Sequence, residues 1–535
     1  YYYTSTDKLW EPEVQYLMDM TVIGGASMKR YRLFSHLVAG IILATLATTS
    51  AFAARDSMNV AAYTKFHTME PYQTSARQMI QMGYLMWDPL VLREPATGKV
   101  IPHVATSWKQ VDDLTWEFKI RDDVTFHNGN KLTSESVRYT IEDRVLNSKP
   151  KSPRISNFKW AKKVEVIDAT TFRIHSHKPY PLVLEQLNTL FIMDEKWTNE
   201  NTFEYVQGHA MGSGPYKFVS WAKGSKVTMV KNDNYWMKGV PAIQNVVIKI
   251  VPEASTRLAE LFSGGVDVSL NLLNDQMPSF KDHTDYEVIN FSILRLDFWM
   301  FDAMGRASET ALKDVRVRRA VAHAIDRKKI LSKLVQAEGY EVNAPTSPYH
   351  FGHDKSIKGY AYNPEKAKAL LAEAGYKDGL EIDLWQYASH QKLFNQAAMQ
   401  MLSKVGIKVN LKDYIGNTQQ MGKLRRSGKI TGIGNFNWGS YNVFDADMIL
   451  HPFFDLEASN NYAGDKELSE WVNEARTSMD SKRRLELYKL AQQRINEEVY
   501  WMPTFGVRRF YGKHKDLSLE AGVDEVPRLQ FARWK

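Results

Sequence analysis

The run Leu380-Glu381-Ile382-Asp383-Leu384-Trp385 decides the fold class, because helices and strands alternate from it onward. It is a predicted strand, and the residues after it predict a helix over 392–405, a strand over 408–411, a short helix near Met421 and a strand over 430–436. Strands that alternate with helices favour α/β lobes in which helices cover the sheets. We therefore expect an α/β fold.

The stretch that follows, residues 435–447, reads Asn435-Phe436-Asn437-Trp438-Gly439-Ser440-Tyr441-Asn442-Val443-Phe444-Asp445-Ala446-Asp447. It fits neither the helical period nor the two-residue period of a strand, so we expect a loop. Large aromatic side chains with a few polar groups are typical of small-ligand sites, and ligands bind at the carboxyl ends of strands in α/β sheets. The alternative is a surface loop whose aromatic side chains pack into the core.

The rest of the chain shows the same mixture of elements. Residues 115–120, Thr-Trp-Glu-Phe-Lys-Ile, alternate with a period of two, which predicts a half-buried strand. Asp314 and Asn363 are good N-caps, and we expect a helix after each, the second with Pro364 at its first position. Further strands are expected over 59–63, 124–126, 164–167, 171–174, 216–221, 226–230, 246–251 and 500–511, and further helices over 134–145 and 482–498.

Length and composition bound the class of protein. At 535 residues the chain is longer than one hydrophobic core usually supports, so two or more lobes are expected. The formal net charge of +8 is spread along the chain, which argues against nucleic-acid binding and allows a modest attraction to an anionic ligand or membrane surface. The absence of cysteine excludes disulfides, thiolate metal sites, a cysteine nucleophile and a cysteine lipid anchor.

An export signal is expected near the amino terminus. Met28-Lys29-Arg30-Tyr31-Arg32 is basic, residues 37–47 are apolar, and Ala51-Phe52-Ala53 places small residues where a signal peptidase cleaves. We expect a cleavable signal peptide over 28–53 and take residues 1–27 as upstream sequence outside the natural protein. The apolar run is too short for a membrane span, so the mature chain is expected free in the periplasm of a two-membrane bacterium.

Catalytic and cofactor patterns are missing from the sequence: there is no G-x-S-x-G elbow, P-loop, H-E-x-x-H pair or Rossmann fingerprint. His350 and His353 could share a metal with Asp354, but no further ligand can be named and we expect solvent-exposed histidines. Asp445 and Asp447 could form an acid–base pair as in glycosidases, yet two carboxylates at this spacing more often open a helix. We expect no catalytic residue, no metal and no cofactor, and therefore no enzyme.

Several short segments form an ordered set along nearly the whole mature chain. They include residues 105–108, 115–122, 124–129 (Val-Thr-Phe-His-Asn-Gly), 132–137, 212–216 (Gly-Ser-Gly-Pro-Tyr), 232–236 (Asn-Asp-Asn-Tyr-Trp), 263–267, 314–320, 324–327 and 363–376. Each is weak alone, but their order and spacing are specific. Together they resemble the extracytoplasmic solute-binding proteins of dipeptide and oligopeptide ABC transporters, which are the bacterial solute-binding proteins of family 5.

The resemblance implies a two-lobe clamshell, the periplasmic binding protein fold, with an extra subdomain inserted in the first lobe. The first lobe would contain residues 54–88, 206–292 and 504–535, the inserted subdomain residues 89–205, and the second lobe residues 293–503. Two crossings of the chain between the lobes would form the hinge. A ligand would bind in the cleft, and closure of the lobes would stabilise the bound form.

In this family a loop of the second lobe carries a Trp, two small residues and then an Asp that pairs with the α-amine of a peptide. Here residues 438–441 are Trp-Gly-Ser-Tyr, so the Trp matches and the acid does not. A buried ammonium without a carboxylate is costly, so a peptide amine would need another partner such as Asp445 or Asp297. Otherwise the ligand would be an opine, a modified amino acid or a small glycoside. The expected ligand-binding residues are Phe436, Trp438, Gly439, Ser440, Tyr441, Asp445, Arg295, Asp297 and Trp299.

The resemblance also implies a function. It predicts the periplasmic solute-binding component of an ABC importer, which captures a peptide or peptide-like small solute and delivers it to an inner-membrane permease. We expect a monomer without a nucleic-acid partner. The alternatives are a protein that binds a non-peptide solute (an opine, a glycoside or a metal chelate such as nickel), a periplasmic hydrolase, and a chemoreceptor-coupled sensor or chaperone with the same fold.

Overall fold

The computed structural model describes residues 55–94, 97–440 and 442–535. The expected signal peptide, the upstream sequence and Tyr441 lie outside these residues. Residues 55–535 group into one structural unit. Within the described part of the chain, no helix is long and apolar enough to cross a membrane.

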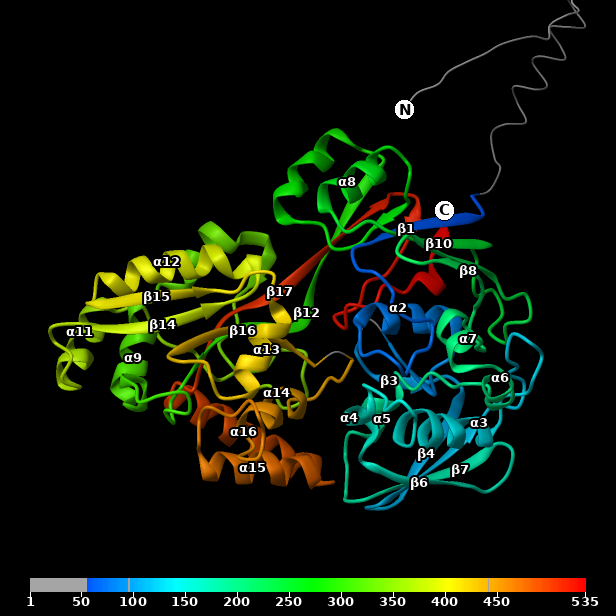
Figure 1. Ribbon diagram of the computed structural model, residues 1–535, viewed down its shortest axis with the longest axis horizontal. Helices are drawn as coiled ribbons and strands as arrows, with labels where there is room; N and C mark the ends of the chain where they lie inside the picture. The colour runs from blue at the N-terminus through cyan, green and yellow to red at the C-terminus, as the bar shows by residue number, and fades with distance from the viewer. Residues whose placement is uncertain (1–54, 95–96, 441) are drawn as a thin grey trace, which may run out of the picture. The chain divides into compact units, whose positions relative to one another are not determined.

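One sheet runs through this unit and joins its two lobes (Figure 1). The strand order is β15 (Ile407–Asp413), β14 (Leu380–Gln386), β16 (Ile433–Gly439), β12 (Tyr286–Phe301), β17 (Trp501–His514), β11 (Val268–Ser269), β1 (Ser57–Ala62), β10 (Asn245–Ile250), β9 (Lys226–Lys231) and β8 (Tyr216–Ala222). A short strand, β13 (Gly339–Tyr340), pairs with β17 outside this path. The long strands β12 and β17 pair antiparallel and carry the chain between the lobes, with a register irregularity between Ser292 and Leu296.

The first lobe surrounds the strands from β11 to β8. Its helices are α2 (Arg77–Met86) and α8 (Ala254–Phe262), and the end of the chain adds the pair β18 (Leu517–Ser518) and β19 (Arg533–Trp534). Its core contains apolar side chains of β1, α2, β9, β10 and the carboxy-terminal segment. This lobe is therefore assembled from segments that lie far apart in the sequence.

A subdomain with its own core lies between α2 and β8 in the sequence. Its antiparallel sheet has the order β4 (Ala105–Asp112), β5 (Thr115–Ile120), β7 (Thr171–Ser176) and β6 (Ala161–Val166). Its other elements are β2 (Val91–Arg93), β3 (Val100–Pro102), α3 (Ser134–Tyr139), α4 (Ile155–Phe158), α5 (Val183–Leu187), α6 (Glu195–Glu200) and α7 (Phe203–Gly208). Phe118 and Phe172 stack in its core with ring centroids 5.3 Å apart. The predicted strand over 115–120 is confirmed.

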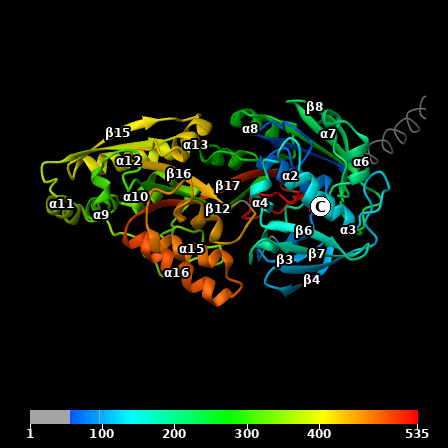
Figure 2. The same cartoon turned by 60° about the horizontal axis from the view of Figure 1, so that its bottom comes forward.

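The second lobe has helices on both faces of β14, β15 and β16. Its helices are α9 (Val315–Ala324), α10 (Arg327–Ile330), α11 (Pro364–Glu373), α12 (Lys392–Ser403), α13 (Thr418–Arg426), α14 (Asp447–Phe454), α15 (Lys466–Thr477) and α16 (Ser481–Glu497). Alternate side chains of β12 enter two cores: Trp299 and Phe301 pack with α9, α11 and α12, whereas Phe298 and Met300 pack with α14, α15 and α16. Figure 1 shows α12 and α15 on opposite sides of the strands, and Figure 2 shows the same lobe with its lower side, which carries α15 and α16, turned forward. The predicted α/β architecture is confirmed.

Local capping signals place two helices of this lobe. Asp314 accepts a hydrogen bond from the Arg316 amide at 2.8 Å, and Asn363 accepts one from the Lys366 amide at 2.9 Å. Pro364 is the first residue of α11, where its missing amide hydrogen has no helical partner to lose. Both capped helices begin where the sequence predicts them.

One strand prediction in the subdomain is wrong, and one helix prediction is confirmed with a change of helix type. Residues 124–126 form only an isolated bridge, because the apolar side chains that suggested a strand are buried in the subdomain core. The expected helix over 134–145 is α-helical only to Tyr139 and continues as a π-helix over Thr140–Leu146. At this junction the Thr140 hydroxyl donates to the Ser136 carbonyl at 2.7 Å, a local bond that competes with the regular helix pattern.

The prediction of a loop from residue 435 is also wrong at its beginning. Strand β16 runs from Ile433 to Gly439, so residues 435–439 belong to the sheet. It pairs with β12 on one side and with β14 on the other. A strand that is covered on both faces needs no alternation of apolar and polar residues, and its sequence therefore lacks the two-residue period. The loop begins at Ser440.

Candidate functional site

The pairing of β12 with β16 brings predicted ligand residues together from distant parts of the sequence. Gly439 lies opposite Arg295, and Asn437 lies opposite Asp297. Successive side chains of a strand point to opposite faces, so Trp438 faces away from Asp297. The predicted residues are thus neighbours in the sheet but divide between its two faces.

A cavity of about 600 Å³ lies where the ends of these strands meet the first lobe. This volume is typical of small-molecule sites. Tyr63, Arg77 and Glu525 come from first-lobe segments and share the cavity with side chains of the second lobe. The complete lining is Tyr63, Arg77, Arg295, Tyr387, Ala388, Thr418, Met421, Gly422, Arg425, Arg426, Phe436, Asn437, Trp438, Gly439, Arg509 and Glu525. Four of the predicted ligand residues are in this lining.

One wall of the cavity is an arginine on an aromatic surface. The Arg425 guanidinium carbon lies 4.9 Å from the ring centroid of Phe436, 5.0 Å from that of Trp438 and 5.3 Å from that of Phe453. Its Nε donates to Asn460 Oδ1 at 3.0 Å, which fixes the plane of the guanidinium. These distances are within the range of cation–π attraction. We call Arg425 with these three rings the aromatic wall.

Another part of the lining holds one carboxylate among arginines. Glu525 lies 3.3 Å from Arg77, 3.6 Å from Arg295 and 4.0 Å from Arg509. Burial raises the pKa of the Glu525 carboxyl, but the three guanidinium groups outweigh it and hold the pKa below the ordinary value of 4.5. The carboxylate is therefore charged at neutral pH. The Glu525 carboxylate therefore occupies the position among these arginines that an anionic group of a solute would otherwise take.

The cavity as a whole is strongly basic. Five of its lining residues are arginines and one is a glutamate, which is a formal charge of +4. Two of the lining aromatic side chains, Tyr63 and Tyr387, add hydroxyl groups. The arrangement can hold an anionic group by charge-assisted hydrogen bonds and a flat or apolar group by stacking.

Asp297 does not line the cavity. Its carboxylate is fully buried and accepts hydrogen bonds from Asn435 at 2.6 Å, Thr504 at 2.8 Å and Gln391 at 3.0 Å. His390 Nε2 lies 3.1 Å away. This carboxylate ties β12 to β16 and to β17, so its contacts are structural.

Asp445 and Asp447 are both buried at the start of α14. Asp445 accepts from Arg484 at 2.7 Å, from the Tyr488 hydroxyl at 2.8 Å and from the Asp447 amide at 3.0 Å. Asp447 pairs with Arg476 at 2.8 Å. Burial raises the pKa of both carboxyls against the pull of these arginines. The contacts match the prediction that the pair opens a helix, and Asp445 does not line the cavity.

The other predicted ligand residues also lie away from the large cavity. Trp299 is fully buried in the second-lobe core, where its indole donates to Asn395 at 3.0 Å. Ser440 is buried and lines a smaller cavity of about 270 Å³ between the loop and the subdomain. Tyr441 is outside the described residues.

His350 is buried, so the expectation of solvent-exposed histidines is wrong for it. The Ser347 amide donates to His350 Nδ1 at 3.1 Å, so the proton of the neutral ring is on Nε2, which donates to Ser440 Oγ at 2.7 Å. Burial lowers the pKa of His350 to about 3. Across the ranges 55–94, 97–440 and 442–535, no group of three His, Cys, Asp or Glu side chains is placed to hold a metal ion.

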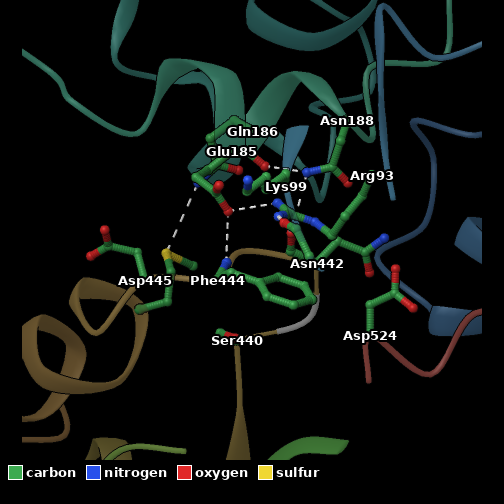
Figure 3. A network of polar contacts seen from close by, with 12 residues as sticks. Arg93, Lys99, Glu185, Gln186, Asn188, Ser440, Asn442, Phe444, Asp445 and Asp524 are labelled. Carbon is green, nitrogen blue, oxygen red and sulfur yellow. Dashed lines mark hydrogen bonds and ion pairs between the residues drawn. The ribbon is translucent and has the colours of Figure 1, made fainter. Parts of the chain in front are cut away.

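A second set of contacts joins the two lobes beyond Ser440, and Figure 3 shows four of its residues, Arg93, Glu185, Asn442 and Phe444. Arg93 donates to the Asn442 carbonyl at 2.9 Å, and its guanidinium carbon lies 4.0 Å from the Phe444 ring centroid. Glu185 accepts from Arg93 at 2.6 Å and from the Phe444 amide at 2.7 Å. The Asn442 amide group donates to the Tyr84 hydroxyl at 3.1 Å. We call these five residues the loop contact.

Several cavity residues were missed by sequence reasoning. Arg425 and Arg426 end an amphipathic helix just before β16, and this doublet was a usable signal. Arg509 follows another arginine in β17, where an apolar strand has no structural need for a pair of cations. Glu525 gave no signal, because its role depends on a backbone with φ of 63° and on arginines from distant segments.

The fold and the cavity between the lobes define the class as a two-lobe solute-binding protein. The family model of the bacterial extracellular solute-binding proteins, family 5 (middle), matches residues 99–461, which is more than half of the chain. The chain belongs to this family.

Named relatives support the same assignment over most of the chain. Heme-binding protein A of Haemophilus influenzae is 28% identical over 468 residues, which cover 81% of this chain and 82% of that protein. The glutathione-binding protein GsiB of Escherichia coli (strain K12) is 27% identical over 491 residues, covering 88% and 92%. The structure of HbpA2 from Haemophilus parasuis matches with a TM-score of 0.79 at 22% identity and covers 90% of this chain and all of that one. That structural match confirms the two-lobe periplasmic binding protein fold.

Proposed function

We propose that this protein is the periplasmic solute-binding component of an ABC importer that captures an anionic, peptide-like small solute between its lobes. The solute is then delivered to an inner-membrane permease. The proposal includes export through the signal peptide 28–53, a monomeric protein without catalysis, and the lobe boundaries expected from the sequence. Family membership supports the transport role. The ligand class rests on the cavity.

The observation that carries the ligand class is the excess of arginine in the cavity. Five arginines and one glutamate line it, and the glutamate is shared by three of those arginines. A solute with carboxylate groups gains charge-assisted hydrogen bonds there. Electrostatic complementarity of this kind also excludes cationic solutes, because like charges are brought together.

The carboxylates considered as partners for a peptide amine are committed elsewhere. Asp445 is bound by Arg484 and Tyr488, and Asp297 accepts three or more hydrogen bonds inside the sheet. A free α-amine would therefore meet no carboxylate in the described lining except Glu525. This favours solutes whose recognition rests on their acidic groups.

The names of the relatives point to the same chemistry. One relative is named for heme and another for glutathione, and each of these ligands carries two carboxylate groups. Glutathione is also a peptide, which fits the expectation of a peptide-like solute. An opine or a metal chelate would present carboxylates too, and both stay within the proposed class.

The test begins with native mass spectrometry of freshly purified protein, which weighs any co-purified solute. A thermal-shift screen then compares glutathione and hemin with their esters and with the zwitterionic dipeptide Ala-Ala. We expect stabilisation by an acid and little by its ester, and a ligand at a hundred times its Kd adds about 2.7 kcal/mol. Stabilisation by the dipeptide or by esters alone would contradict the proposed ligand class.

A further inference from the structure

Arg425 differs from the other buried arginines in how few acceptors it has. Its side chain is 6% exposed, and its only hydrogen bond to a described residue is the one from Nε to Asn460. Arg257 is equally buried and donates to four carbonyl oxygens. Arg484 is paired with Asp445. Arg425 is thus a buried cation whose terminal nitrogens are not matched by acceptors among the described residues.

The surroundings of Arg425 compensate its charge only in part. Three aromatic rings lie within 5.3 Å of the guanidinium carbon, and no carboxylate of the described chain forms an ion pair with it. Burial lowers the pKa of Arg425 to about 10, which reflects the cost of keeping the charge away from water. The group nevertheless remains charged at neutral pH. It lines the cavity, so a solute can reach it.

Arg425 differs from the other four arginines of the cavity, because Arg426 is exposed to water and the remaining three share an internal carboxylate. Arg77, Arg295 and Arg509 share the carboxylate of Glu525. Arg425 has no such internal anion in the described part of the chain. An incoming carboxylate therefore gains most where no internal carboxylate competes for the guanidinium.

We propose that Arg425 is the residue that selects the solute, by binding one of its carboxylates through the terminal guanidinium nitrogens. Phe436 and Trp438, the two rings of the aromatic wall that line the cavity, then hold the adjoining part of the solute by stacking. This inference rests on the proposed function and narrows it to solutes in which a free carboxylate stands next to a flat or apolar group. Contacts with the rings of Phe436 and Trp438 hold the guanidinium in position, and the hydrogen bond to Asn460 fixes the orientation of its plane.

The test uses isothermal titration calorimetry with the carboxylate probe, glutathione or hemin, that binds the wild-type protein more tightly, and with its ester. We expect Arg425→Gln to raise the Kd of the acid by about thirtyfold or more, the usual loss when one partner of a buried charge pair is removed. Arg425→Lys should recover part of the affinity, because a point charge cannot form the two parallel bonds. The matched control is Lys423→Gln, which removes an exposed cation from the same helix outside the cavity. Its Kd should equal the wild-type value.

Comparing the acid with its ester distinguishes direct binding of the solute carboxylate by Arg425 from a purely structural role of Arg425. In the wild-type protein the acid should bind more tightly than the ester, and in Arg425→Gln this preference should disappear. An equal loss of affinity for acid and ester would overturn the assignment, because it would show a structural role only. Unchanged binding of the acid by Arg425→Gln would overturn it too. If the wild-type protein binds neither these probes nor any other carboxylate solute, the co-purified one included, the proposed function itself falls.

Discussion

The cavity and the loop contact both join the two lobes, but they differ in how their charges are balanced. In the loop contact one cation, Arg93, meets one anion, Glu185, and the pair is completed by backbone groups of Asn442 and Phe444. In the cavity five arginines face one glutamate. The loop contact balances its one cation with one anion, whereas the cavity has four more cations than anions. From this difference we expect the loop contact to contribute affinity for any solute and the cavity to select which solute binds.

The largest expected effect on solute binding comes from disrupting the aromatic wall of the cavity. Trp438→Ala deletes a ring that lies under Arg425 and packs against Phe453 with centroids 5.0 Å apart. We expect stabilisation by a bound solute to be abolished while the solute-free protein stays folded, because Trp438 is only half-buried. Thermal unfolding with and without the glutathione or hemin probe measures both. Tyr349→Ala, an exposed ring outside the cavity, is the control. Undiminished binding by Trp438→Ala would remove the aromatic wall from the site.

A second change removes the internal anion of the cavity. Glu525→Gln leaves Arg77, Arg295 and Arg509 without their shared carboxylate, and breaking a buried pair usually costs about 3 kcal/mol or more of unfolding free energy. Affinity for an anionic solute should rise, since the competing carboxylate is gone. Urea unfolding measures the first effect and calorimetry the second. Lower affinity for the acid would show that Glu525 itself contacts the solute.

The same variant has a predicted pH dependence. The folded pKa of Glu525 lies below the ordinary 4.5, so the unfolded chain takes up this proton first as the pH falls. The carboxylate therefore contributes stability that is present above about pH 4.5 and lost as the pH falls through the folded pKa. The difference in unfolding free energy between wild type and Glu525→Gln should shrink below that pH. A difference that widens instead would contradict the arrangement of charges.

A third change weakens the loop contact and leaves the cavity intact. Arg93→Gln removes a buried cation that contacts Glu185, Asn442 and the Phe444 ring. We expect a loss of about 2 kcal/mol of binding free energy. Affinity for the acid and for its ester should fall by the same factor, because selection depends on Arg425. Calorimetry with both probes measures the ratio. A changed acid-to-ester ratio would show that the two regions do not act separately.

Sequence reasoning succeeded where the cause of a structure is local. The caps at Asp314 and Asn363 and the alternation over 115–120 need only near neighbours, and the structure confirms them. Trp438 is predicted as a ligand residue from its place after a strand and from the family's loop pattern, and Arg295 from the expected junction of the lobes. Both line the cavity, although their contact with a solute stays a prediction.

The rest depends on partners that no local pattern reveals. Asp297 accepts a bond from Thr504, 207 residues away, and Arg77 reaches the backbone next to Glu525 across 447 residues. Such long-range pairs determine whether a carboxylate is hydrogen-bonded within the protein or is available to bind a solute in the cavity. The sequence offered Asp445 and Asp297 as acids for a solute, and long-range burial commits both to the protein itself.

The smallest expected effect separates the two regions by pH alone. His350 forms a hydrogen bond with Ser440, which lies two residues before Asn442 of the loop contact. Burial lowers the pKa of His350 to about 3, and the like charge of His353 lowers it further. The unfolded ring protonates near 6.5, so the unfolded state binds one more proton below that pH and stability falls on acidification. From pH 6.5 to 5.5 the unfolding free energy should fall by about 1 kcal/mol more in wild type than in His350→Gln.

His127 and His451 titrate in both proteins, so their contributions cancel in this difference. Over this range Arg425 and Glu525 keep their charges, so the acid-to-ester preference should stay constant while affinity falls. Equal pH slopes for wild type and variant would show that His350 does not support the loop.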